Sequence, residues 1–179
     1  MTWRLLSPHE AATVEAMTAR IIPSDTTPGA REARAVRYID RALADVDREL
    51  APLYRDGVAE LDALCRDRHG RPFAELDDGA QDAILTELDA PPEHEEASAA
   101  DRLRRFFAIV WEHTIQGTFG DPRHGGNHAT VGWRLVGFPG AQWGYSAEEM
   151  REGFDARQIP VRTLEALREE RLETARGRR

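Results

Sequence analysis

The chain has 179 residues and a formal net charge of −8, with 41% hydrophobic and 31% charged residues, a composition that fits one globular domain. All 24 basic residues are arginine, so a Schiff-base lysine and a nucleotide-binding Walker lysine are both excluded. No basic stripe runs along the sequence, and phosphate backbones need clustered positive charge, so nucleic acid is not expected as a partner. The single cysteine, Cys65, excludes an internal disulfide and multi-cysteine metal sites.

The first predicted helix begins after Ser7. Ser7 and Glu10 have the spacing of a capping box, and Pro8 occupies the first helical position. Apolar residues then recur at helical spacing until Pro23 ends the helix. A second helix is predicted from the apolar stripe Val36, Ile39, Leu43, Val46 and Leu50. A third, after Pro52, is predicted from Tyr54, Val58, Leu61 and Cys65, with Gly70 as its left-handed cap.

Two further helices complete the predicted bundle. A short fourth helix follows an aspartate cap at Asp77 or Asp78, and its inward face consists of Ile84, Leu85 and Leu88. The acidic, proline-broken run 89–96 is predicted to be a solvated loop. The fifth helix is the most apolar, and we expect it at the centre of the bundle with Phe106, Val110 and Ile115 buried. The sequence therefore predicts an all-α fold, a small bundle of about five helices.

The pattern changes after the fifth helix. Six glycines and two prolines lie between Gly120 and Gly140, without a sustained helical or strand period. The tail is highly charged, and only Leu164 and Leu167 have helical spacing. We therefore expect a helical domain over residues 1–146, with this turn-rich region at its C-terminal end. A charged tail over 147–179 is expected to be helical and to lie on the surface or on a partner.

Aromatic residues alternate with the turns of this glycine-rich region. Some of them must pack on the bundle, and the others would be exposed on a rigid surface, which is typical of a protein–protein anchor site. The candidate interface residues are Arg123, Trp133, Arg134, Phe138, Trp143 and Tyr145.

Catalytic motifs are not found. No serine lies in a G-x-S-x-G elbow, and no G-x-G-x-x-G dinucleotide motif follows a strand. An alternative hypothesis is a metal site formed by His113, His124 and His128, which would make the chain an independent metal-dependent enzyme. A structural role for these histidines is favoured, because a flexible HGGNH loop does not fix the ligand geometry that a helix would.

Two sequence blocks resemble the gluconate 2-dehydrogenase subunit 3 family. The first comprises Ile21-Ile22-Pro23, Asp25, Pro28-Gly29-Ala30 and Tyr38-Ile39-Asp40. The second comprises Phe106, Phe107, Thr114, Gly117, Phe119, Asp121, Pro122, Gly125, Gly126, Asn127, Gly132, Trp133, Gly137, Phe138, Pro139 and Gly140. The resemblance runs from about Leu6 to Tyr145 in the family's order.

The resemblance implies an all-helical subunit without a redox cofactor or catalytic residues of its own. Such subunits bind, stabilise or help mature, in a chaperone-like way, a larger subunit that carries FAD and oxidises a sugar, sugar acid, polyol or glycoside, often alongside a cytochrome c subunit. Many also supply a twin-arginine export signal, which this sequence lacks. A free-standing helical scaffold is a further alternative.

The expected location follows from the segments that the sequence lacks. It shows no signal peptide and no stretch of the ~18 apolar residues that span a membrane, so direct membrane insertion is not expected. As written, the chain is expected in the cytoplasm, and in the periplasm only if a partner carries it or a signal is missing.

Overall fold

The computed structural model describes residues 2–90 and 99–176, and within them it contains helices and turns but no β-strand. The α-helices are α1 (Pro8–Ile21), α2 (Ala35–Ala44), α3 (Ala51–His69), α4 (Asp78–Asp89), α5 (Ala99–Phe119), α6 (Val131–Val136) and α7 (Leu164–Arg176). Short 3-10 helices are η1 (Arg48–Leu50), η2 (Phe73–Glu75), η3 (Pro122–His124), η4 (His128–Thr130) and η5 (Ala156–Gln158). The predicted all-α fold is confirmed, whereas most of the predicted 89–96 loop lies outside the described residues.

The helix ends follow the local capping signals. At the start of α1 the Glu10 backbone N–H donates to Ser7 Oγ at 3.2 Å, and the Ser7 N–H donates to Glu10 Oε2 at 2.7 Å. Of the two candidate caps of α4, the structure uses Asp77, whose Oδ1 accepts from Ala80 N. Gly70 ends α3 with a left-handed φ of 72°. These ends are predictable because capping involves only neighbouring residues.

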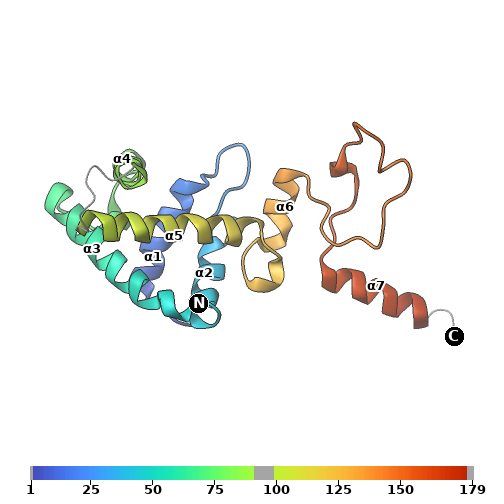
Figure 1. The fold of residues 1–179 in the computed structure, drawn as a ribbon, viewed down its shortest axis with the longest axis horizontal. Coiled ribbons are helices and arrows are strands. Elements are labelled where there is room, and N and C mark those ends of the chain that lie inside the picture. The colour runs from blue at the N-terminus through green and yellow to red at the C-terminus, as the bar shows by residue number, and fades with distance from the viewer. Residues whose placement is uncertain (1, 91–98, 177–179) are drawn as a thin grey trace.

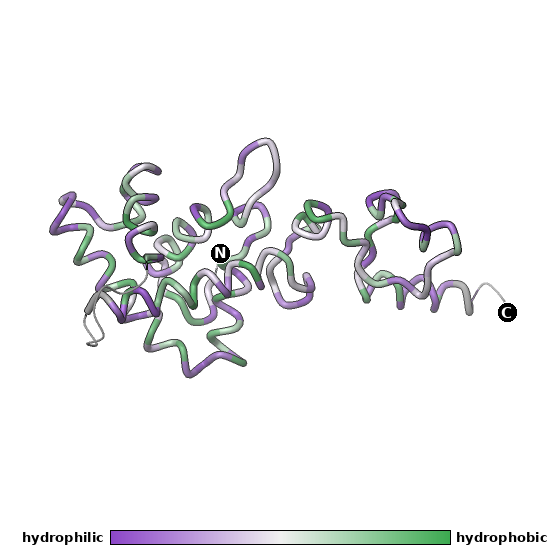
Figure 2. The backbone as a smooth tube through the Cα atoms, turned by 45° about the horizontal axis from the view of Figure 1, so that its top comes forward, coloured by the Kyte–Doolittle hydropathy of each residue, from purple (hydrophilic) through white to green (hydrophobic). Residues whose placement is uncertain are grey.

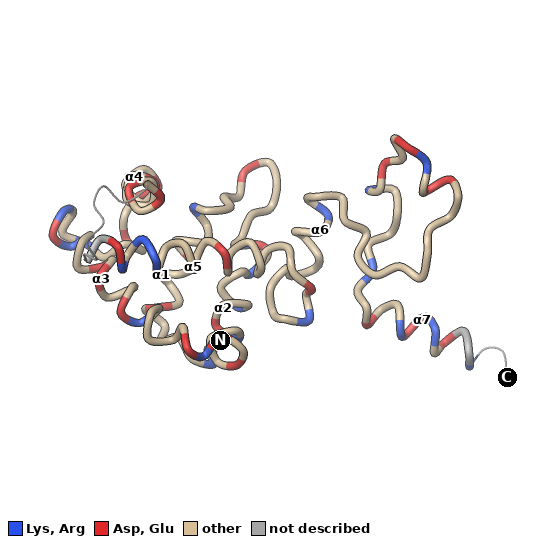
Figure 3. Tube along the Cα trace, in the orientation of Figure 1, with Lys and Arg blue, Asp and Glu red and all other residues tan. Residues whose placement is uncertain are grey.

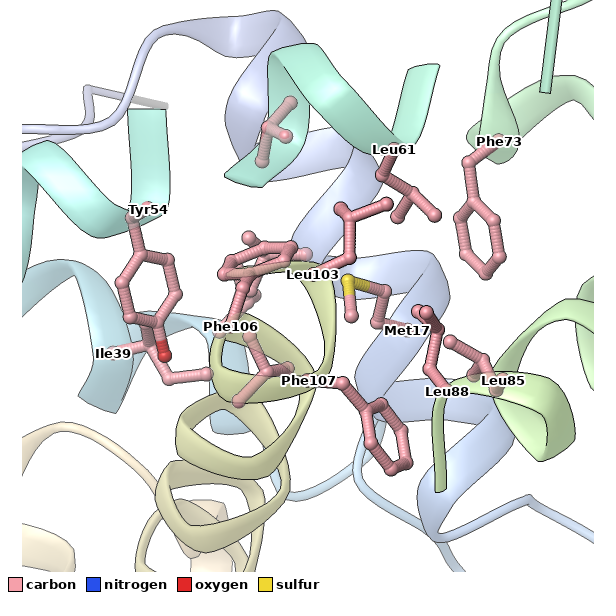
Figure 4. Packing of buried hydrophobic residues seen from close by; sticks show 14 of the residues in the cluster. Met17, Ile39, Tyr54, Leu61, Phe73, Leu85, Leu88, Leu103, Phe106 and Phe107 are labelled. Atoms are coloured by element: carbon pink, nitrogen blue, oxygen red, sulfur yellow. The ribbon is translucent and has the colours of Figure 1, made fainter. Parts of the chain in front are cut away.

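Helix α5 lies at the centre of the bundle and contacts α1, α2, α3 and α4 (Figure 1). Phe106 is fully buried, and its ring meets the edge of Tyr54 with centroids 5.4 Å apart. Figure 4 shows this packing between residues of α1 to α5, and Figure 2 shows hydrophobic stretches on the same helices. Gly57 lies where any Cβ would overlap the Phe106 ring, so α3 and α5 approach closely there.

Three expectations about individual elements are wrong. Helix α2 ends at Ala44 rather than near Leu50, because the backbone turns at Asp45, and Val46 is 72% exposed. Ile115 is only half-buried, since it lies on a face of α5 that the other helices leave partly open. Helix α6 lies within the glycine-rich region, where no regular element was predicted; it has six residues, too few to show a period.

Residues 137–176, here called the C-terminal arm, extend away from the bundle beyond α6 (Figure 1). The arm folds back on itself where Arg162 N donates to Pro139 O and Ala141 N donates to Arg162 O. Helix α7 carries charges of both signs (Figure 3), while Leu167 of the same helix is buried. Among the described residues, the structure contains no helix with the length and apolar character needed to cross a membrane.

Candidate protein-binding surface

The glycine-rich region begins as a cap on the C-terminal end of α5. A helix end leaves backbone carbonyls without partners inside the helix. Here the Asn127 backbone N–H donates to Gly117 O at 2.7 Å, and its side-chain Nδ2 donates to Gly120 O at 2.8 Å. Trp133 Nε1 donates to Phe119 O, also at 2.8 Å. The loop therefore supplies hydrogen-bond donors to the carbonyls at the C-terminal end of α5.

Asn127 is the residue that organises this cap. It is fully buried, and its Oδ1 also accepts a hydrogen bond from Gly132 N at 2.9 Å. Its φ of 43° is left-handed, a conformation that asparagine tolerates better than most residues. Sequence reasoning placed Asn127 in a tight turn and in the second family block, but it did not predict the hydrogen bonds to the end of α5.

Two glycines allow the loop to lie directly on α5. A Cβ at Gly126 would overlap Gly117 O, and a Cβ at Gly132 would overlap Thr118 O. Because both obstacles are backbone atoms of a helix, they cannot move aside, and any side chain would separate the loop from α5. The motif glycines thus serve close packing.

Trp133 lies beneath the surface rather than on it. It is 6% exposed, and the Phe138 ring packs against it edge-to-face with centroids 5.2 Å apart. Trp133 was predicted as an interface residue, but it packs beneath Phe138 and its indole N–H caps α5. The structure places the other five on the exterior.

The exposed aromatic residues follow Trp133 in the chain. Phe138 is 47% exposed, Trp143 63% and Tyr145 45%. Leu135 and Val136 at the end of α6 are also exposed. We call these residues the aromatic surface: Leu135, Val136, Phe138, Trp143 and Tyr145. Such large apolar side chains in water are typical of a protein-binding site.

Arginines and hydrogen bonds hold the arm that carries Trp143 and Tyr145. Arg171 of α7 lies over the Trp143 ring, 5.3 Å from its centroid. Gln142 Nε2 donates to Pro139 O and Pro160 O, while Arg162 donates to Gln142 Oε1. Arg123 on η3 and Arg134 on α6, the two predicted arginine anchors, are exposed.

The first sequence block has structural roles in the bundle. Asp40 is buried, and its carboxylate accepts from the backbone N–H groups of Arg4, Leu5 and Leu6, which fixes the N-terminal segment on α2. A Cβ at Gly29 would lie 2.6 Å from Pro23 O, so the turn after α1 needs glycine. Sequence reasoning gave Asp40 no role, because its partners lie more than thirty residues away in the chain.

The three candidate metal-binding histidines have separate environments. His113 is buried, with Nδ1 hydrogen-bonded to Tyr54 Oη at 2.8 Å and Nε2 3.6 Å from Asp47 Oδ2. His124 is exposed and accepts from Arg123 Nε, and His128 is exposed on η4. Within the described residues, no three His, Cys, Asp or Glu side chains are placed to hold a metal ion. The structure does not assemble the alternative metal site.

Desolvation shifts the pKa of three buried side chains, Cys65, His113 and Tyr54. Burial raises the pKa of the Cys65 thiol to about 11, so the reactive thiolate is disfavoured. Burial lowers the pKa of His113 despite the nearby Asp47 carboxylate. The phenol beside it, Tyr54, is fully buried, and the same desolvation raises its pKa. His113 and Tyr54 form a polar contact inside the core.

Comparison with known proteins agrees with the two sequence blocks. The model of the family described as gluconate 2-dehydrogenase subunit 3 matches residues 8–140, from the first turn of α1 to the base of the arm. No curated protein and no solved structure matches the chain. The family match covers more than half of the chain and includes the whole helical bundle and the cap of α5. The chain belongs to the gluconate 2-dehydrogenase subunit 3 family.

Proposed function

We propose that this chain is a non-catalytic small subunit that binds and stabilises, or helps mature, the FAD-containing large subunit of a dehydrogenase acting on a sugar, sugar acid or glycoside. The family is named for a subunit of a dehydrogenase, and this name supports an accessory role for the chain. The FAD belongs to the partner in this proposal, and a cytochrome c subunit is a further candidate member of the complex.

The observation that supports this proposal most strongly is the aromatic surface. Phe138, Trp143 and Tyr145 are about half-exposed or more, yet they follow a loop fixed by buried hydrogen bonds to α5. An ordered base reduces the entropy lost when exposed side chains bind. Aromatic residues beside arginines are also the residue types that most often dominate binding energy. This arrangement favours a protein partner over a small-molecule substrate.

Co-expression with an FAD-containing subunit tests the proposal. We expect the tagged chain to capture that subunit and to increase the amount that carries bound flavin. Trp143→Ala should weaken the complex by roughly 2 kcal/mol or more, as truncation of an anchor residue does. Trp111→Ala provides a matched control, because Trp111 is 49% exposed on α5, outside the aromatic surface.

The result separates the proposed role from its alternatives. If the large subunit gains flavin and stability without this chain, the proposed role is wrong. If no flavoprotein binds, the free-standing scaffold becomes the better hypothesis. A flavin absorbance band on the isolated chain would contradict the assignment of FAD to the partner.

A further inference from the structure

Four non-glycine residues among those that the structure describes have a left-handed backbone, and they lie together. They are Arg34, with a φ of 56°, and Asn127, Ala129 and Thr130, with φ of 43°, 52° and 59°. The His128 N–H donates to Ala33 O at 3.0 Å, so the loop that contains the last three lies directly on the residue before Arg34. We call Arg34 and residues 127–130 the left-handed joint.

The backbone of the joint is strained. A left-handed φ brings Cβ close to a carbonyl oxygen, and the cost in free energy is largest for a β-branched residue such as Thr130. Asparagine tolerates this conformation, but alanine and threonine do not favour it. Gly126 and Gly132, which lie on either side of residues 127–130, do not have a positive φ. The strain therefore falls on residues that are not glycine.

Hydrogen bonds on both sides of the joint impose this conformation. Before it, the Asn127 N–H donates to Gly117 O at 2.7 Å. After it, Gly132 N donates to Asn127 Oδ1 at 2.9 Å, and Trp133 Nε1 donates to Phe119 O at 2.8 Å. A strained backbone persists only where its surroundings over-determine it, and such strain often belongs to a functional site.

Two helices begin at the joint with unusual caps. Arg34 is the N-cap residue of α2 and Thr130 that of α6, and neither side chain makes a capping hydrogen bond. An N-cap residue ordinarily has an extended backbone and accepts a hydrogen bond through its side chain. At Thr130 the left-handed backbone instead turns the chain into α6, which leads to the exposed Leu135 and Val136 of the aromatic surface. The joint thus sets the direction of α6.

We infer that the left-handed joint positions the partner-binding surface: its strain is retained because it holds α6, and with it the aromatic surface, in the orientation that the partner needs. Ala129 is the informative residue because it is exposed, so substitutions there change the preferred backbone angle with little change in packing. The identity of the partner rests on the proposed function. The geometry of the joint rests on contacts within the chain.

The first test measures the direction of α6 in the isolated chain. Spin labels on R55C in α3 and R134C in α6, both exposed positions, report the distance between these helices by pulsed electron paramagnetic resonance. Cys65 is fully buried and should stay unlabelled. The distance distribution should stay narrow in A129N and become broader or displaced in A129V, because a β-branched residue resists a left-handed φ. An unchanged distribution in A129V overturns the inference.

The second test measures affinity for the FAD-containing large subunit at a temperature where melting curves show every variant folded. A129N should bind at least as tightly as the parent chain, and A129V about fivefold more weakly. The matched controls are H128N and H128V, because His128 is exposed but does not have a positive φ. They should bind alike. If A129V does not fold, A129L supplies a milder change.

The outcomes distinguish this inference from the proposed function. If A129V binds more tightly than A129N, binding relieves the strain, and the positioning inference is wrong. Equal affinities of the parent, A129N and A129V also overturn it, while the proposed function stands. If the parent chain captures no flavoprotein, the proposed function fails, and the distance measurement alone decides whether the joint directs α6. An affinity order that follows left-handed preference at position 129 but not at 128 supports the inference.

Discussion

The bundle and the C-terminal arm differ in where their apolar side chains lie. In the bundle, Tyr54, Phe106 and Met17 are completely buried. In the arm, Ile159 and Leu167 are buried, whereas Trp143 and Met150 are more than 60% exposed. Burial of apolar surface is the main force that stabilises a fold. The bundle therefore contains its own source of stability, while the arm retains apolar surface that a partner can bury.

The cap of α5 connects these two regions. Asn127 and Trp133 bind carbonyls at the end of the central helix, and Phe138 packs on Trp133. The position of the arm thus depends on a buried junction whose hydrogen bonds are satisfied by the bundle. Substitutions in the bundle and at the junction should therefore change stability, whereas substitutions of exposed arm residues should change binding.

The largest expected effect is in the bundle. Phe106→Ala removes a fully buried ring that contacts Tyr54, and it should lower the free energy of unfolding by about 3–5 kcal/mol. Urea titration followed by circular dichroism measures the change. An unfolding free energy equal to that of the parent would contradict the position of Phe106 in the core.

At the junction, Asn127→Ala should cost roughly 2–3 kcal/mol. The substitution leaves Gly120 O and Gly132 N without their partner and places alanine at a left-handed φ. The same denaturation measurement applies, with exposed His128→Ala as the neighbouring control. An effect no larger than that of the control would contradict the assigned role of Asn127.

A smaller, pH-dependent effect is expected at His113. Burial lowers its pKa in the folded chain, whereas in the unfolded chain it titrates near ~6.5. The unfolded state therefore takes up the proton first, and stability falls as the pH decreases through that value. His113→Phe should remove this part of the slope of unfolding free energy against pH. An unchanged slope between neutral and mildly acidic pH would refute the assignment.

The smallest effect on stability is expected in the arm. Trp143→Ala should change the unfolding free energy by less than about 0.5 kcal/mol, because the ring is 63% exposed. Trp133→Ala, by comparison, removes a buried ring and the hydrogen bond to Phe119 O. Calorimetry of both variants tests the contrast. Equal destabilisation would place Trp143 in a core and remove it from the aromatic surface.

Much of the bundle was predictable from the sequence. The ends of α1 and α4, the Gly70 cap and the central position of α5 follow from capping residues and apolar periodicity. The end of α2 was not predictable, because Val46 continues the apolar period although the backbone has already turned at Asp45. For the candidate site, the aromatic and arginine residues remain a prediction as interface residues, and only the structure shows that Trp133 among them is buried.

The sequence by itself determined α1, α3, α4 and α5, the family, and the residue types of the candidate protein-binding region, because capping, periodicity and short motifs act between near neighbours. Only the tertiary structure decided that Trp133 caps α5 while Trp143 is exposed, and that Arg41 of α2 donates to the Arg123 carbonyl of η3. Those outcomes depend on which backbone atoms α5 leaves unpaired and on how closely Gly126 and Gly132 let the loop approach. Long-range geometry of this kind has no local pattern in the chain.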